Sequence, residues 1–361
     1  MTIAAWFAVQ KRLACIFKLQ RCYQVGMRYE KIDTDNGNSS SDDASSRMVP
    51  TSSTDDSSPQ QNSVSSPELQ VAPMSNDISS THYTSKRLSP LVESVKNILN
   101  QPFPPPMYNL PYGVHMTPLQ QLQYAFARFL EIVRPNVDNI EVLEVADKLK
   151  SFKFQEEYVQ KFAELVMCCE PFANLPPNDK WLLFRHFWCA FYSMERYYSS
   201  VEMFGYDSNK YLIDMQFAAD LNTQWYISTV TPDKSIEYNN FCSQVKVKWM
   251  KNFITPIKLL GITRFEIVYM LIQMMWSVHV VDGVSDATKA IGNRILEQVS
   301  SELHNFYTYD MQLPNYASRH AQLMRLISVA ENHVHMYKDY MLMARIFNIF
   351  ENELYISELI D

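Results

Sequence analysis

Glycine scarcity is the feature that most restricts how this chain can fold. Only 7 of its 361 residues are glycine, and any two of them lie at least nine positions apart. Loops that hold a phosphate need clustered glycines, because backbone N–H groups must come close to the anion. The sequence therefore excludes dinucleotide-binding fingerprints, Walker loops and kinase glycine loops. Since a helix interior disfavours glycine by about 1 kcal/mol per position, the scarcity also favours an all-α fold.

Hydrophobic periodicity supports the same fold class. Helices are predicted at 88–100, 118–134, 138–151, 154–170, 178–203, 232–253, 264–281, 285–309, 315–349 and 353–360. The stretches 181–194 and 267–278 are apolar on nearly every side, which predicts that they form a middle layer. Residues 224–230 are rich in aromatic and β-branched side chains and predict a short strand. We expect a three-layer antiparallel helical sandwich of about 10–12 helices.

The composition divides the chain into three segments. Residues 1–32 carry six Lys or Arg against one acid, although the net charge of the whole chain is −7. Residues 33–90 are rich in serine and aspartate and poor in large hydrophobes, so we expect a disordered hinge. Residues 91–361 contain the apolar periodicity and form the predicted helical domain.

No enzyme class fits the remaining motifs. The chain has no G-x-S-x-G, H-E-x-x-H or C-x-x-C pattern, and its six cysteines lack the spacing of a disulfide framework, which favours a reducing compartment. His333 and His335 would point about 200° apart on a helix, so we expect solvated or capped helix histidines and no shared metal. The longest apolar stretch, 265–281, contains polar residues and predicts a core helix, not a membrane span. We expect a binding or regulatory protein.

Three stretches resemble the nuclear hormone receptor family, in the divergent style of the supplementary receptors of nematodes. RCYQVGMRYE at 21–30 resembles the end of the zinc-finger DNA-binding domain. Residues 171–188 resemble the ligand-binding-domain signature that joins helices 3, 4 and 5, with Asp179 nine residues before Trp188 and Lys180 in place of glutamine. The C-terminal YISELI at 355–360 resembles the activation helix.

The resemblance implies a groove that binds a coregulator helix with an L-x-x-L-L face. Glu358 would cap the N-terminus of that helix, where unpaired N–H groups favour an anion. Arg185 keeps one basic residue of the groove rim, whereas Met167 stands where the family has a second one. Either the missing charge changes coregulator choice, or Arg185 compensates alone. The predicted groove and activation-helix residues are Arg185, Tyr355, Ile356, Glu358, Leu359 and Ile360.

The resemblance also implies an apolar pocket for a fatty acid, sterol or similar lipophile. The predicted lining residues are Met167, Cys168, Met194, Tyr197 and Met270. The alternative is that the same residues fill a core without a cavity.

Residues 1–32 resemble only the C-terminal end of a DNA-binding domain. A complete domain holds two zinc ions with eight cysteines, but this segment offers Cys15 and Cys22, and Ala14 and Phe17 stand at two further ligand positions of the family. Cys22 is thus a remnant zinc ligand at most. We expect no cofactor, zinc only if a longer isoform carries a complete finger, and no autonomous zinc-dependent DNA binding.

The resulting hypothesis is a nuclear transcription regulator that binds a lipophilic ligand, recruits coregulators through its activation helix, and forms a homodimer or a heterodimer with another nuclear receptor. Dimerisation is expected on the 315–349 helix, at Arg319, Gln322, Arg325 and His333. The alternative is a partner that cannot bind DNA, dimerises with full-length receptors and modulates them.

Overall fold

The computed structural model describes residues 85–105, 115–350 and 352–360. They belong to a unit that runs from 76 to 361. The predicted finger remnant at 1–32, with Cys15 and Cys22, and residues 33–84 of the predicted hinge lie outside the described residues. The last residues of that hinge, 85–90, are helical, so the predicted boundary at 90 cuts through the first described helix, α2 (Ser85–Leu99).

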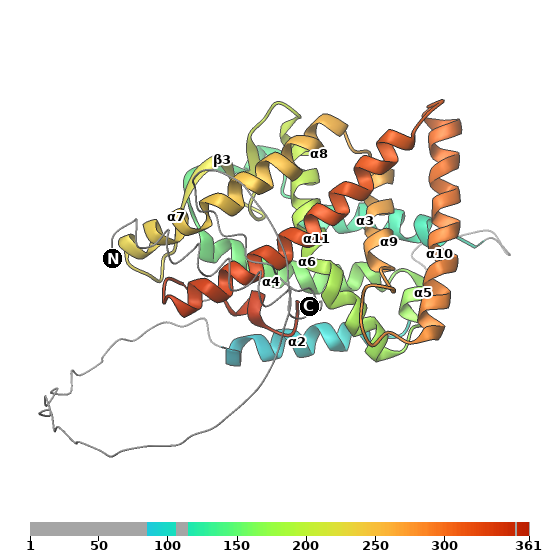
Figure 1. Ribbon diagram of the computed structural model, residues 1–361, viewed down its shortest axis with the longest axis horizontal. Helices are drawn as coiled ribbons and strands as arrows, with labels where there is room; N and C mark the ends of the chain where they lie inside the picture. The colour runs from blue at the N-terminus through green and yellow to red at the C-terminus, as the bar shows by residue number, and fades with distance from the viewer. Residues whose placement is uncertain (1–84, 106–114, 351, 361) are drawn as a thin grey trace, which may run out of the picture. The chain divides into compact units, whose positions relative to one another are not determined.

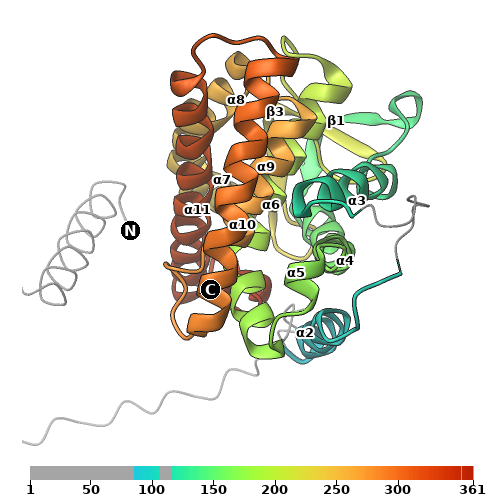
Figure 2. The same ribbon diagram turned by 90° about the vertical axis from the view of Figure 1, so that its right-hand side faces the viewer.

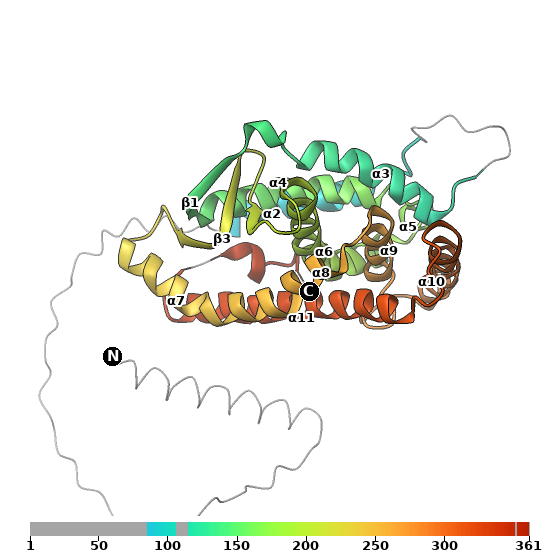
Figure 3. The same ribbon diagram turned by 90° about the horizontal axis from the view of Figure 1, so that it is seen from above.

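Two helices, α6 (Pro177–Phe204) and α9 (Arg264–Met275), form the middle of a three-layer arrangement (Figure 3). Their side chains are buried on nearly all sides. Helices α3 (Pro118–Val133) and α4 (Lys148–Val166) cover one face, and α7 (Pro232–Trp249) and α11 (Ala317–Ile346) cover the other (Figures 1 and 3). This arrangement confirms the predicted helical sandwich. It forms because helices that are apolar on nearly every side need neighbours on both sides.

The other helical elements complete these layers (Figure 2). They are α5 (Glu170–Ala173), α8 (Thr255–Leu260), α10 (Asp286–Asn305), the 3-10 turns η1 (Val137–Asn139) and η4 (Glu353–Ile356), and the π-helical turns η2 (Met250–Ile254) and η3 (Phe306–Asp310). Side-chain caps mark the N-termini of several helices. Thr117 and Thr263 form capping boxes with Gln120 and Glu266, at α3 and α9 respectively.

A three-stranded sheet replaces one predicted helix. Residues 138–151 were expected to be helical, but Glu141–Asp147 forms β1, which pairs in parallel with β3 (Phe217–Tyr226). The strand β2 (Lys210–Leu212) pairs antiparallel with β3. Ala146 packs in a small core with Ile213 and Ala219, a contact between distant segments that local periodicity cannot show. The strand predicted at 224–230 overlaps only the end of β3.

Gly292 lies inside α10, where helix propensity alone gives no reason for a glycine. A Cβ atom there would lie 3.0 Å from both γ-carbons of Val278. The glycine therefore permits close packing between α10 and the segment that follows α9. Gly205 and Gly261, at predicted connections, have φ angles of 87° and 56°, a region that glycine enters without strain.

Candidate functional site

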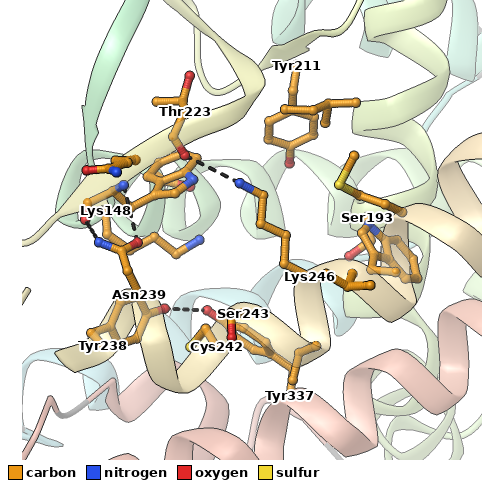
Figure 4. Close-up of a pocket in the computed structure, with 18 of the residues that line it drawn as sticks. Lys148, Ser193, Tyr211, Thr223, Tyr238, Asn239, Cys242, Ser243, Lys246 and Tyr337 are labelled. Atoms are coloured by element: carbon orange, nitrogen blue, oxygen red, sulfur yellow. Dashed lines mark hydrogen bonds between the residues drawn. The ribbon is translucent and has the colours of Figure 1, made fainter. Parts of the chain in front are cut away.

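A cavity of about 540 Å³ lies between α4, α6, the sheet, α7 and α11 (Figure 4). Each element contributes to the lining, as does the C-terminal segment. The lining includes Gln155 of α4, Tyr197 of α6, Tyr211 of β2, Trp249 of α7, Tyr337 of α11 and Tyr355 of η4. The cavity thus joins segments from most of the described chain.

Aromatic rings form much of one wall. The ring of Tyr197 lies 4.7 Å from that of Tyr211 and 5.9 Å from that of Trp249, measured between centroids. The indole of Trp249 stacks on His333 with centroids 3.9 Å apart and planes inclined by 25°. Such flat, largely apolar surfaces suit a lipophilic ligand.

Two lysines add positive charge to the cavity. The Lys148 ammonium lies 4.6 Å from the ring centroid of Trp225, and burial lowers its pKa to about 8. Lys246 reaches across the cavity and donates a hydrogen bond to the Thr223 carbonyl at 3.4 Å (Figure 4). Burial lowers the pKa of Lys246, while the nearby carboxylate of Asp220 opposes that shift. Among the described residues that line the cavity Asp220 is the only acid, so the cavity favours an anionic or acceptor group.

His333 corrects one expectation from the sequence. It was expected to be a solvated or capped helix histidine, but its ring lines the cavity and stacks on Trp249. Burial, reinforced by the charge of Lys148, lowers the pKa of His333 to about 3. The imidazole is therefore neutral at physiological pH, and α11 turns a wider face toward the interior than its apolar stripe indicates.

The C-terminal segment packs on the domain without forming the helix predicted at 353–360. Only η4 is helical, because Ser357 is extended and its hydroxyl donates to the Leu354 carbonyl and accepts from the Leu359 N–H. The segment is nevertheless anchored. Trp188 donates its indole N–H to the Leu359 carbonyl at 2.6 Å, and Lys338 donates to the Ile360 carbonyl at 3.1 Å.

Tyr355 connects this segment to the cavity. Its hydroxyl accepts a hydrogen bond from the Gln155 amide at 3.1 Å, and its ring lies 4.7 Å from that of Tyr337. All three residues line the cavity. Burial raises the pKa of Tyr355 well above its ordinary value, so the phenol stays protonated. A molecule in the cavity would meet the C-terminal segment directly.

Five of the six predicted groove and activation-helix residues belong to the C-terminal segment, and the sixth, Arg185, lies on α6. Leu359 and Ile360 are buried, and Glu358 is exposed, with Lys96 of α2 at 3.0 Å from its carboxylate. Arg185 is half-buried on α6, and Met167 is buried at the end of α4. The side chain of Ile356 lies outside the described part of the structure.

The predicted pocket residues are mostly placed elsewhere. Tyr197 lines the cavity, whereas Met167, Cys168, Met194 and Met270 do not. Met194 and Met270 are fully buried in the middle layer, and Cys168 is partly exposed after α4. Sequence reasoning missed Lys148, Lys246 and Trp249, because no motif distinguishes them from other helix residues.

The predicted dimerisation residues are divided between two environments. Gln322 and Arg325 are exposed on α11, but Arg319 donates to the Glu266 carboxylate and to the carbonyls of Leu260 and Gly261. Because His333 also faces inward, two of the four predicted residues, Arg319 and His333, make their contacts inside the domain. Dimerisation itself stays a prediction.

The described residues offer neither a metal site nor a membrane span. In that part of the chain, no group of three or more His, Cys, Asp or Glu side chains could hold a metal ion. Within the same ranges no helix has the length and apolarity to cross a membrane.

Comparison with known proteins gives a consistent family. Residues 137–347 match the model of the ligand-binding domain of nuclear hormone receptor. The chain is 24% identical to nuclear hormone receptor family member nhr-213 of Caenorhabditis elegans, over 73% of this chain and 63% of the relative. It is 26% identical to family member nhr-54 of the same organism, over 56% of this chain and 50% of the relative. The chain thus spans between half and two thirds of the length of these two relatives.

Proposed function

We propose, since the chain belongs to the nuclear hormone receptors and carries their ligand-binding domain, that it binds an amphipathic ligand and recruits a coregulator in response. The family consists of transcription regulators and not of enzymes. Ligand occupancy, coregulator binding and action in the nucleus are the parts that go beyond family membership.

The observation that carries the proposal is the position of Tyr355. It belongs to the cavity wall and to the C-terminal segment at once, and its hydroxyl is hydrogen-bonded to Gln155. A ligand that displaces or strengthens this contact changes the free energy of the segment that presents Glu358. Such differential contact is what a ligand needs in order to shift a conformational equilibrium.

The cavity lining supports a class of ligand. Aromatic rings favour a hydrophobic body, and the two ammonium groups of Lys148 and Lys246 favour a carboxylate or another anionic head. A long-chain fatty acid has both features. A neutral lipid of the same length lacks the head group.

The ligand half of the proposal is tested by measuring binding of a long-chain fatty acid and of the corresponding alcohol to the full chain. The acid should bind more tightly than the alcohol, and Lys148→Met should remove that preference. Lys153→Met, on an exposed position of the same helix, is the matched control. Equal affinities of the acid and the alcohol for the unchanged chain would reject the assigned ligand class.

The coregulator half is tested with a labelled L-x-x-L-L peptide in a fluorescence titration. Glu358→Ala or deletion of 353–361 should abolish binding, because both remove the acid that caps the partner helix. Glu297→Ala, an exposed acid on α10, should leave binding unchanged. If Glu358→Ala and the deletion both keep the affinity of the unchanged chain, the coregulator assignment is wrong.

A further inference from the structure

We infer that α2 is an internal occupant of the proposed coregulator groove and that a coregulator helix must displace it. This inference rests on the proposed coregulator function. Helix α2 packs against α4, the first half of α6 and the C-terminal segment, the three elements that would form the groove. Figure 1 shows α2 running along the edge of the domain beside α4.

The apolar face of α2 accounts for the docking. Five apolar side chains recur at helical spacing on this face, and each is at most 8% exposed: Leu88, Leu91, Val92, Val95 and Leu99. The first three occupy the first, fourth and fifth positions of a five-residue run, as do the leucines of an L-x-x-L-L helix. The opposite face of α2 is exposed.

Polar contacts connect α2 to the groove rim. The Ser94 hydroxyl donates to the Gln160 side chain of α4 at 2.9 Å. The Lys96 ammonium lies 4.7 Å from the ring centroid of Trp181 on α6 and 3.0 Å from the Glu358 carboxylate. Lys96 lies in the last turn of α2, so Glu358 meets the C-terminal end of this helix through a side-chain cation, whereas it would cap the N-terminus of a coregulator helix. Because this ion pair is largely exposed, it orients α2 more than it stabilises it.

The sequence of α2 makes this occupant replaceable. A helix of 15 residues is marginal on its own in water, and Pro90 removes one of its backbone hydrogen bonds. Its helical state therefore depends on the surface that it covers. Residues 100–117 join α2 to α3, so an undocked α2 stays tethered near the groove and competes at a high effective concentration.

The test compares peptide affinity in full-length variants. Val95→Glu places a carboxylate at a fully buried position of α2 and should free the groove. If α2 fills the groove in about nine molecules out of ten, the apparent Kd for an L-x-x-L-L peptide should fall about tenfold. Asn97→Glu adds the same charge on the exposed face and should leave the Kd unchanged.

Equal affinities of the unchanged chain, Val95→Glu and Asn97→Glu would overturn the inference and leave the coregulator proposal standing. No peptide binding by any of the three would reject both. If Val95→Glu disturbs folding, Leu91→Ala replaces it, because it shortens a buried side chain of α2 without adding a charge. Leu91→Ala should also lower the apparent Kd, whereas an affinity equal to that of the unchanged chain would again overturn the inference.

Discussion

Lys148 should destabilise the ligand-free protein in a pH-dependent way. Burial lowers the pKa of its ammonium from 10.5 to about 8. At about 1.4 kcal/mol per pKa unit, the shift corresponds to about 3 kcal/mol. The folded state binds the Lys148 proton less tightly than the unfolded state, so between pH 8 and 10.5 the unfolded chain holds more protons. The contribution of Lys148 to the free energy of unfolding therefore rises with pH between 8 and 10.5 and is lowest below pH 8.

The perturbation is Lys148→Met, which keeps the length of the side chain and removes the charge. We expect the free energy of unfolding to increase by about 3 kcal/mol at pH 7 and by much less near pH 10. Urea unfolding followed by circular dichroism at both pH values measures this, with the exposed Lys153→Met as control. If the difference between Lys148→Met and the unchanged chain is the same at both pH values, the burial argument is refuted.

Two further predictions concern packing and anchoring. Gly292→Ala should lower the free energy of unfolding by about 1 kcal/mol, because the new methyl group would lie 3.0 Å from the fully buried Val278. Alanine favours helices more than glycine does, so a variant that is more stable in urea unfolding would contradict the close packing. Trp188→Phe should lower the free energy of unfolding by about 1–3 kcal/mol, because it leaves the Leu359 carbonyl without its indole donor. The same change should weaken binding of the L-x-x-L-L peptide. An unchanged melting temperature and unchanged peptide affinity would show that this hydrogen bond does not anchor the segment.

The parts of the fold that the sequence predicted are those that depend on local pattern. Helices α6 and α9 were recognised because a run that is apolar on every side can be identified within one segment. Strand β1 was mistaken for a helix because its partner, β3, begins at Phe217, far along the chain. Its seven residues show no feature that separates a paired strand from an amphipathic turn until that partner is known.

In the candidate site too, the sequence predicted the features that depend on local pattern and missed those that depend on distant contacts. The pattern YISELI marked the C-terminal segment, but not that Ser357 would end its only helical turn. The cavity residues Lys148 and His333 follow from how helices rotate against one another, which a single sequence does not specify. Lys148 was also placed near the end of a predicted helix, whereas it begins α4 directly after β1.

Ligand and coregulator binding are coupled, on the proposed function, through one short segment. Tyr355 faces the cavity, and Glu358, three residues later, meets Lys96 of α2. A ligand that changes the position of Tyr355 therefore changes the surface that α2 and a coregulator helix share. Linkage requires the effect to be reciprocal, so a coregulator that displaces α2 must alter ligand affinity by the same factor by which the ligand alters coregulator affinity. Weakening α2 therefore raises coregulator affinity even in an empty domain, whereas changing Gln155 or Tyr355 alters the segment that α2 and the coregulator helix both contact.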